Sequence, residues 1–244
     1  SHIRLGEGAA CGIAPRMTIS DQWQLRVTTH GSEEQPVVVI DAFAPDPHGL
    51  REDATFLAFA RIGDHYPGVR AVVPEAVLRP FVAALAPVAR DVFGLTDLSV
   101  VDSFYSVVTT PPDALAPIQR LPHFDEVSPT RLALLHYLSE DEASGTAFYR
   151  QRSTGYESID ATRLPAYRAA LADDLARHGM PGAGYVDATS PLFEQVARHQ
   201  GRFNRAILYR SNTLHCADIP AGMSFSADPY DGRLTVNTFL DARG

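Results

Sequence analysis

The sequence predicts a mainly β protein with flanking helices, in which the strands form an antiparallel sandwich or jelly roll. Short β-branched and apolar runs, separated by turn residues, fill the C-terminal part of the chain. Of the 244 residues, 45% are hydrophobic and 20% are charged, a balance typical of a globular protein with a substantial core. Because the sequence contains no repeat, linker or low-complexity tract, we expect one domain.

The expected elements divide this domain into two parts. Strands are expected at 23–27 and 36–40, and then at 98–109, 131–139, 146–150, 203–211 and 233–241. Apolar residues at helical spacing predict helices at 50–63, 74–94, 163–178 and 191–200. We therefore interpret 17–97 as a helical layer with edge strands and 98–244 as the jelly-roll core. Residues 1–16 precede Met17 and lack an apolar signal region, so we expect a vector-derived or disordered leader there.

The composition excludes several functional classes. All 21 basic residues are arginine, so the chain has no lysine for a Schiff base, a P-loop or a protein-kinase site. The net charge of −8 disfavours a nucleic-acid partner, because it repels phosphate. No apolar run approaches the ~18 residues of a membrane span, so we expect no membrane partner. Two distant cysteines, Cys11 and Cys216, are typical of a reduced cytoplasmic protein. The oligomeric state is left open.

The sequence Pro122-His123-Phe124-Asp125 is the strongest candidate for a functional site. In a strand, residues two apart point to the same face, so His123 and Asp125 can direct an imidazole and a carboxylate to one point. A second histidine, His215, lies 92 residues later, after the strand expected at 203–211. Two imidazoles and one carboxylate form the facial triad that binds non-haem Fe(II), although Mn, Co, Ni and Zn accept the same donors.

A second motif lies on the last expected strand. Arg233 and Thr235 share one face of it by the same two-residue rule. A guanidinium fork beside a hydroxyl is well suited to bind a carboxylate bidentately. These two residues therefore indicate a binding site for a carboxylate.

Together these motifs resemble the iron(II)/2-oxoglutarate-dependent dioxygenase superfamily, and their order is similar to that of its prolyl-4-hydroxylase-like branch. The resemblance covers roughly 100–244 and includes the run RLALLHYLS at 131–139, the acidic turn at 140–142 and the run GTAFY at 145–149. It implies that the core is a double-stranded β-helix, which is the jelly roll that the strand pattern already favours.

The resemblance also implies the metal and the type of reaction. His123, Asp125 and His215 would bind Fe(II), and O2 would react there together with 2-oxoglutarate. Halogenating relatives need a small residue where this chain has Asp125, so the resemblance implies hydroxylation, with succinate and CO2 as co-products.

For the cosubstrate, the resemblance implies three binding residues. Arg233, helped by Thr235, would hold the distal carboxylate of 2-oxoglutarate. Tyr105, on the strand that precedes the His-x-Asp motif, would donate its hydroxyl to the same carboxylate.

The expected substrate is a small molecule, such as an amino acid or a natural-product intermediate, and a protein or peptide side chain is the close alternative. Two other classes fit the same residues. One is a non-catalytic jelly-roll protein that binds metal as a sensor or binding module. The other is a cupin-like metal-dependent isomerase or lyase, in which Arg233 would hold the carboxylate of the substrate itself.

Three features outside these motifs receive a structural interpretation. The segment HYPGVR at 65–70 fits a lid over the substrate mouth, but its Pro-Gly pair favours a simple turn. His136, in the middle of an expected strand, is expected to be a hydrogen-bonded structural histidine. Cys216 follows His215, so its side chain is expected to face away from the metal and into a core.

Overall fold

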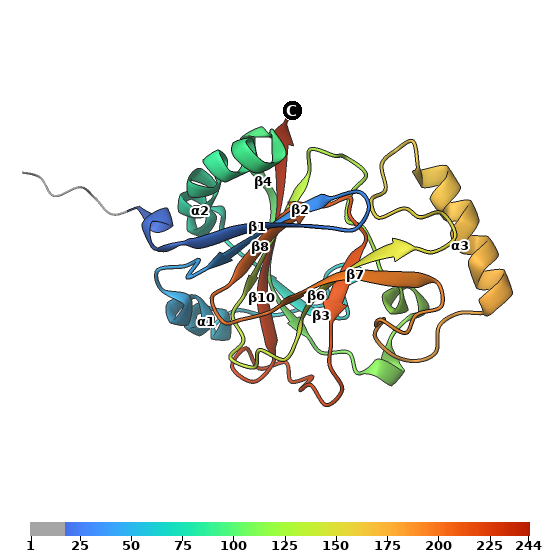
Figure 1. Ribbon diagram of the computed structural model, residues 1–244. Helices are drawn as coiled ribbons and strands as arrows, with labels where there is room; N and C mark the ends of the chain where they lie inside the picture. The colour runs from blue at the N-terminus through green and yellow to red at the C-terminus, as the bar shows by residue number, and fades with distance from the viewer. Residues whose placement is uncertain (1–17) are drawn as a thin grey trace, which may run out of the picture.

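Seven antiparallel strands form the larger sheet of the computed structural model, which describes residues 18–244 (Figure 1). Their order across the sheet is β1-β2-β8-β5-β10-β4-β3. They span Gln24–His30 (β1), Gln35–Asp41 (β2), Ala206–Arg210 (β8), Leu132–Tyr137 (β5), Arg233–Arg243 (β10), Thr96–Val108 (β4) and Gly68–Val72 (β3). The leader expected at 1–16 lies outside the described residues.

Three antiparallel strands form the smaller sheet, in the order β7 (Phe193–Gln200), β6 (Gly145–Gln151) and β9 (His215–Asp218). The two sheets face each other, because Phe148 of β6 packs in one apolar cluster with Leu135 and Tyr209 of the larger sheet. From β5 onward the chain crosses repeatedly between the sheets, with β5, β8 and β10 in the larger and β6, β7 and β9 in the smaller, and two antiparallel sheets stacked in this way form a jelly roll. The predicted fold class is therefore confirmed.

Helices cover the outer faces of this sandwich (Figure 1). Both α1 (Pro47–Thr55) and α2 (Glu75–Val88), which continues into a π-helical turn at Ala89–Phe93, pack on the larger sheet. The smaller sheet is covered by α3 (Leu164–His178). Short 3-10 turns occupy Ile19–Gln22, Pro112–Ala114 and Pro117–Arg120. Within residues 18–244, no helix combines the length and the apolar character that crossing a membrane requires.

Strand alternation decides which side chains reach the space between the sheets. In β5, Tyr137 belongs to the apolar cluster between the sheets, whereas His136 contacts Phe43 below the helices. The register of β10 and β4 extends these two rows across the sheet. Thr235 is paired with Tyr137, whereas Tyr105 is paired with the β10 residue that opposes His136. The row of Tyr137 therefore faces the interior of the sandwich, and the row of His136 faces the helices.

The helix predicted at 191–200 is wrong, because this segment forms strand β7. Its pairing with β6 shifts where Phe148 opposes Ala197 and Tyr149 opposes Gln195, which leaves Val196 as an extra residue in a bulge. The bulge interrupts the two-residue alternation, so that buried Phe193 is followed by partly buried Val196 and Ala197. This gives the strand the apolar spacing of a helix.

The helix predicted at 50–63 is displaced toward the N-terminus. The side chain of Asp46 caps α1 by accepting a hydrogen bond of 2.8 Å from the Gly49 amide, and Pro47 occupies the first turn. The helix ends at Thr55. The residues that follow lead to β3 at the edge of the larger sheet.

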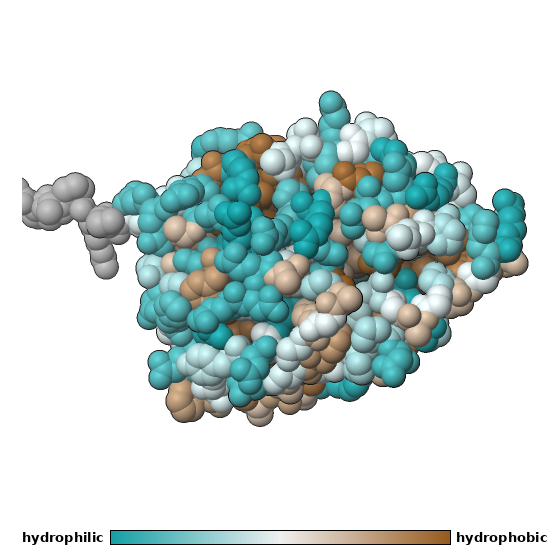
Figure 2. Space-filling view, turned by 60° about the horizontal axis from the view of Figure 1, so that its bottom comes forward, coloured by the Kyte–Doolittle hydropathy of each residue, from teal (hydrophilic) through white to brown (hydrophobic). Residues whose placement is uncertain are grey.

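Polar side chains cover most of the surface in Figure 2, and apolar ones form small separate areas. Among the exposed large apolar side chains, Phe56 is 81% exposed and Val72 is 64% exposed. Single apolar residues of this kind are ordinary on protein surfaces. Val72 is of interest because β3 directs it to the same side of the sheet as Thr235.

A buried carboxylate joins the β1–β2 turn to the smaller sheet. Glu157, which is fully buried, accepts hydrogen bonds from the amides of Ser32 (2.8 Å) and Glu33 (3.0 Å) and from Nε of Arg150 (2.8 Å). Burial alone would raise the pKa of Glu157, but these donors outweigh it and lower the pKa. The ionised carboxylate therefore stabilises the fold.

We expect Glu157→Gln to lower the free energy of unfolding by about 2–3 kcal/mol, because it removes charge-assisted hydrogen bonds from a buried site. Urea denaturation at neutral pH measures this. Glu194→Gln is the control: it removes an exposed partner of the same Arg150 and should cost less than about 1 kcal/mol. Equal losses in the two variants would contradict the argument.

The stabilisation of the fold by the ionised Glu157 carboxylate depends on pH. Because the pKa of Glu157 is lower in the folded chain than the ordinary value of 4.5, its contribution is complete above that value. It is lost as the pH falls through the lowered pKa. The difference in the free energy of unfolding between the wild type and Glu157→Gln should therefore become smaller below about pH 4.

Candidate metal centre

His123, Asp125 and His215 meet at one point of the sandwich, as the sequence predicts. One ligand atom from each lies within 4.8 Å of the other two. The Nε2 atoms of His123 and His215 are each 3.6 Å from a different carboxylate oxygen of Asp125. This arrangement of two nitrogens and one oxygen fits a single divalent transition-metal ion.

The backbone brings these distant parts of the chain together. The amide of His123 donates to the carbonyl of His215 (2.9 Å), and the amide of His215 donates to the carbonyl of His123 (2.8 Å). The amide of Asp125 donates to the carbonyl of Ser211 (2.8 Å). The segment around His123 thus lies beside β9 as one more antiparallel strand would, whereas the backbone of Asp125 is tied to the residue that follows β8 of the larger sheet.

The ring of His215 is oriented for metal binding. Its Nδ1 lies 2.8 Å from the carbonyl oxygen of Thr213 and donates a hydrogen bond to it. This tautomer leaves the lone pair of Nε2 free to bind a metal. The imidazole packs against the ring of Tyr209, with 5.0 Å between the centroids. Tyr209, which the sequence motif does not indicate, therefore contacts the His215 ring from the larger sheet.

The electrostatics of the triad favour a cation. Partial desolvation lowers the pKa of His123 well below its ordinary value, and His215, His65 and Arg70 lower it further. Burial raises the pKa of Asp125, and the positive charges nearby offset only part of that effect. Neutral imidazoles are the form that binds metal, and a divalent cation would stabilise the Asp125 carboxylate.

The centre is open on one side. The side chain of His123 is 44% exposed, whereas those of Asp125 and His215 are 18% and 7% exposed. A metal bound here would therefore be held from the inside of the sandwich and reached from the side of His123.

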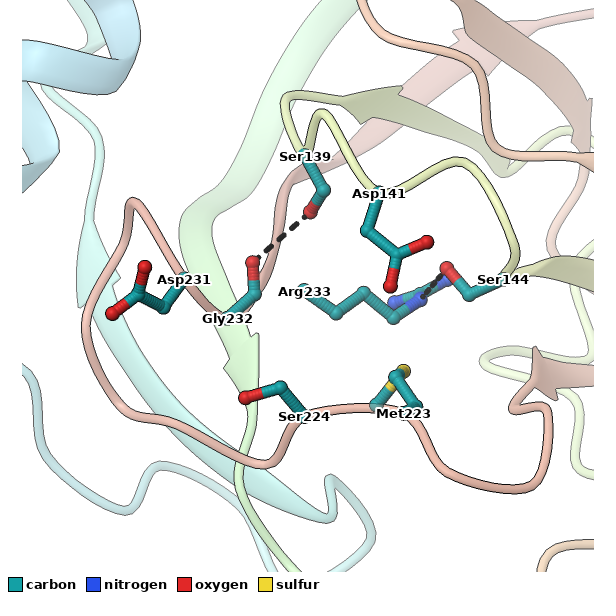
Figure 3. Close-up of a pocket in the computed structure, with 8 residues that line it drawn as sticks. All are labelled: Ser139, Asp141, Ser144, Met223, Ser224, Asp231, Gly232 and Arg233. Atoms are coloured by element: carbon teal, nitrogen blue, oxygen red, sulfur yellow. Dashed lines mark hydrogen bonds between the residues drawn. The ribbon is translucent and has the colours of Figure 1, made fainter.

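Arg233 lies deeper in the same sandwich and is 5% exposed. Its Nε donates to the hydroxyl of Ser144 (3.0 Å), and its Nη2 donates to the carbonyl of Gly145 (2.9 Å). Within residues 18–244, no carboxylate lies within ion-pair distance of it. The loops at 138–144 and 219–232 form a small pocket against its guanidinium (Figure 3), which is lined by Ser139, Asp141, Ser144, Met223, Ser224, Asp231 and Gly232.

Thr235 lies two residues further along β10, on the face that points between the sheets. It is fully buried, and its hydroxyl donates to Oδ1 of Asn237 (2.7 Å). It pairs with Tyr137 of β5 and therefore lies in the row that faces the interior. The structure therefore places both predicted carboxylate-binding residues of the last strand on the interior face.

Tyr105 is not brought to this site, so its assignment is corrected. It lies in the outward-facing row of β4, where it packs among Leu78, Val236 and other apolar residues under α1 and α2. Burial raises the pKa of its hydroxyl to about 12. Neighbouring residues of a strand point to opposite faces of the sheet. Ser106 lies on the interior face of β4, so the adjacent Tyr105 points to the helices instead.

Tyr66 takes the place that was expected for Tyr105. Its hydroxyl is completely buried, lies near Thr235, Ser106 and Arg233, and has no hydrogen-bond partner in the described part of the chain. Burial raises the pKa of Tyr66, which keeps the phenol protonated and able to donate. The segment at 65–70 carries Tyr66 inward and continues as β3 from Gly68.

Arg70 is a further residue that no sequence motif indicates. It lies on β3, where it pairs with Ser106 in the row that contains Thr235. Its guanidinium lies 4.0 Å from the ring centroid of Tyr66 and 5.2 Å from that of Phe104. Its charge acts on both Asp125 and His123. Arg70 therefore lies on the interior face of the edge strand β3, where its charge acts on the metal centre.

His136 and Cys216 have structural positions, as expected. Nε2 of His136 lies 3.0 Å from Oδ1 of Asn204, on the helix side of the larger sheet. Cys216 is buried in the apolar cluster beneath α3.

Comparison with protein-family profiles matches residues 21–240 to the family described as "Family of unknown function (DUF6445)". The chain belongs to the DUF6445 family. No curated protein matches the sequence. The candidate metal centre is therefore a site in a DUF6445 protein.

Several solved structures are similar to this DUF6445 chain. HygX from Streptomyces hygroscopicus with nickel and 2-oxoglutarate bound is 15% identical, with a TM-score of 0.54 over 86% of this chain and 84% of HygX. HygX with nickel, 2-oxoglutarate and hygromycin B bound is 14% identical, with a TM-score of 0.50 over 86% and 84%. A prolyl-4-hydroxylase from Pseudomonas putida is 14% identical over 87% of this chain and 95% of its own, with a TM-score of 0.46. The chain shares the fold of HygX.

We expect Asp125→Asn to weaken the binding of Co(II) to this DUF6445 chain about 100-fold or more, because it removes the only anionic donor of the triad. Isothermal titration calorimetry under identical buffer conditions measures the affinity. Glu126→Gln, which changes the neighbouring carboxylate, is the matched control and should bind Co(II) like the wild type. Equal affinities of the Asp125 and Glu126 variants would remove Asp125 from the metal centre.

Proposed function

We propose that this chain is a non-haem Fe(II)/2-oxoglutarate-dependent oxygenase. It hydroxylates a small molecule, such as an amino acid or a natural-product intermediate, and forms succinate and CO2 as co-products. The observation that carries the proposal is the presence of two matched features inside one jelly roll. One is a three-residue metal centre with an open side, and the other is a buried arginine that forms no ion pair within residues 18–244.

The donor set supports iron as the metal. Two imidazoles and one carboxylate offer three ligands and leave the remaining positions of an octahedral ion for other molecules. The hydrogen bond from Nδ1 of His215 to Thr213 fixes the tautomer that such a centre needs. Mn, Co, Ni and Zn suit the same donors, so the assignment of Fe(II) rests on the proposed reaction.

The arginine and tyrosine behind the metal centre support 2-oxoglutarate as the cosubstrate. Arg233 would hold its distal carboxylate through guanidinium N–H groups that Ser144 and Gly145 do not occupy. Tyr66 brings to the same region a buried hydroxyl that makes no hydrogen bond within residues 18–244. A buried polar group without a partner costs free energy unless a ligand satisfies it, and a carboxylate would satisfy both residues.

Each residue then has a distinct task in the reaction. Bound iron and 2-oxoglutarate supply the oxidising chemistry, in which O2 is consumed, 2-oxoglutarate is decarboxylated and the substrate is hydroxylated. His123, Asp125 and His215 hold the metal with one face open. Arg233 and Tyr66 donate to the distal carboxylate, Thr235 lines the site beside them, and Tyr66 remains protonated because its raised pKa keeps the proton on the phenol.

Two observations support a small-molecule substrate. The chain has a net charge of −8, which disfavours a nucleic-acid substrate. HygX, which shares the fold, has been crystallised with hygromycin B as well as 2-oxoglutarate. A protein side chain remains the alternative that the assay below distinguishes, because free amino acids and intact protein can be tested side by side.

The test is succinate release by protein loaded anaerobically with Fe(II) and then exposed to O2, with a panel of free amino acids and with intact protein. We expect succinate that requires iron, 2-oxoglutarate and O2, and that rises with one class of added compound. Arg233→Gln should abolish it, because the distal carboxylate loses its cationic partner. Metal binding without succinate would instead support the sensor. Turnover of a substrate without consumption of O2 would support the isomerase or lyase.

We expect Tyr66→Phe to raise the dissociation constant for 2-oxoglutarate about tenfold, since it removes one hydrogen bond to a charged group. Calorimetry on the Co(II)-loaded protein measures this without turnover. Tyr105→Phe is the matched control, because Tyr105 lies on the helix side of the same sheet. A larger effect from Tyr105 than from Tyr66 would restore the assignment that the structure corrects.

A further inference from the structure

Arg70 carries a charge that nothing in the described chain satisfies. Its guanidinium makes no hydrogen bond or ion pair to any residue of 18–244, and its buried Nε has no partner. The rings of Tyr66 and Phe104 contact it through their faces. Such stacking fixes the plane of a guanidinium but leaves its in-plane N–H groups free to donate.

Other arginines held within the protein have acceptors in the chain, although Nε of Arg51 also lacks one. Carboxylates or carbonyls accept hydrogen bonds from Arg51, Arg120, Arg150, Arg163, Arg205 and Arg210. Arg233 is held by Ser144 and Gly145. A partly desolvated arginine without an acceptor is costly to keep. The contrast indicates that the acceptor for Arg70 is a molecule other than this chain.

Arg70 also stands where a substrate would lie. It is in the interior row of the larger sheet, and its charge reaches Asp125 and His123 of the metal centre. The next row outward contains Val72 and Phe104. Val72 is 64% exposed although it points to the same side of the sheet as Thr235. An apolar, solvent-accessible surface therefore adjoins the free guanidinium.

We propose that the Arg70 guanidinium binds a carboxylate of the substrate beside the metal centre, so that the substrate is an organic acid with an apolar portion that contacts Val72 and Phe104. This inference rests on the proposed function, because it assigns the substrate class of the same site. Arg70 is then the residue that determines specificity, and Arg233 is left to the cosubstrate.

The position of Arg70 separates it from the cosubstrate site. Arg233 is on β10 and Arg70 is on β3, with β4 between them. Two strand spacings place their backbones about 10 Å apart across the sheet. Arg70 is also one row further toward the exposed end of the strands. A carboxylate held by Arg70 is therefore a different group from the one held by Arg233.

The test compares acids with their neutral amides on protein loaded with Co(II) and 2-oxoglutarate. The probes are hexanoate with hexanamide and phenylacetate with phenylacetamide, and calorimetry measures their affinities for wild type, Arg70→Gln and Arg70→Lys. We expect the wild type to bind the acids about tenfold to a hundredfold more tightly than the amides, which is the worth of a charge-assisted hydrogen bond. Arg70→Gln should remove this preference, and Arg70→Lys should retain part of it.

Arg61→Gln is the matched control, because it changes an exposed arginine in the segment that leads to β3. It should keep the preference for acids. The dissociation constant for 2-oxoglutarate should be unchanged in Arg70→Gln. Equal binding of acid and amide by the wild type, including no binding of either, would overturn the proposal without any variant. A loss of 2-oxoglutarate affinity in Arg70→Gln would overturn it as well, by assigning Arg70 to the cosubstrate.

The succinate assay separates this inference from the proposed function. Succinate release with no preference for acids would leave the oxygenase proposal standing and remove the role of Arg70. A preference for acids that depends on Arg70, in a protein that forms no succinate when loaded with iron, would remove the oxygenase proposal and keep the carboxylate site.

Discussion

The candidate site depends on the pair of backbone hydrogen bonds that joins His123 to His215. These residues are 92 positions apart in the chain, and the reciprocal bonds make them neighbours in one antiparallel ladder. Once this pairing exists, alternation places Asp125 two residues along on the same side. The third bond, from the amide of Asp125 to Ser211, fixes the loop that carries it. The geometry of the triad is thus a property of the backbone, and the side chains only complete it.

Behind the triad, the interior of the jelly roll holds two arginines that form no ion pair within residues 18–244. Arg233 and Arg70 both face the space between the sheets, and Tyr66 lies between them with its ring against one and its hydroxyl near the other. A fold does not keep such an arrangement for its own stability, since Glu157 and Arg150 show how this chain neutralises charges that serve structure. The unmatched arginines instead mark the places where anionic ligands bind.

The parts of the fold and of the candidate site that could be predicted from the sequence are those whose pattern lies within one short segment of the chain. His123, Asp125, Arg233 and Thr235 follow a two-residue rule within one short segment each, and the structure brings all four to the interior. Tyr105 failed because parity within a thirteen-residue strand decides its face, and that parity becomes visible only through its pairing with β10. Strand β7 was hidden by its bulge. Tyr66 was hidden by the Pro-Gly pair that follows it, whose turn signal masks the start of an edge strand.

The two interior arginines differ in how they are held, and the difference bears on what each can bind. Ser144 and Gly145 occupy two sides of the Arg233 guanidinium, which fixes both its position and the direction of its remaining donors. That arrangement suits a carboxylate that always has the same position and shape. Arg70 is held only by aromatic faces, which restrict its plane and leave its edge free. A guanidinium of this kind can rotate in its plane to meet acids of different shape. The preorganised arginine therefore suits the cosubstrate, and the adaptable one suits the molecule that is hydroxylated.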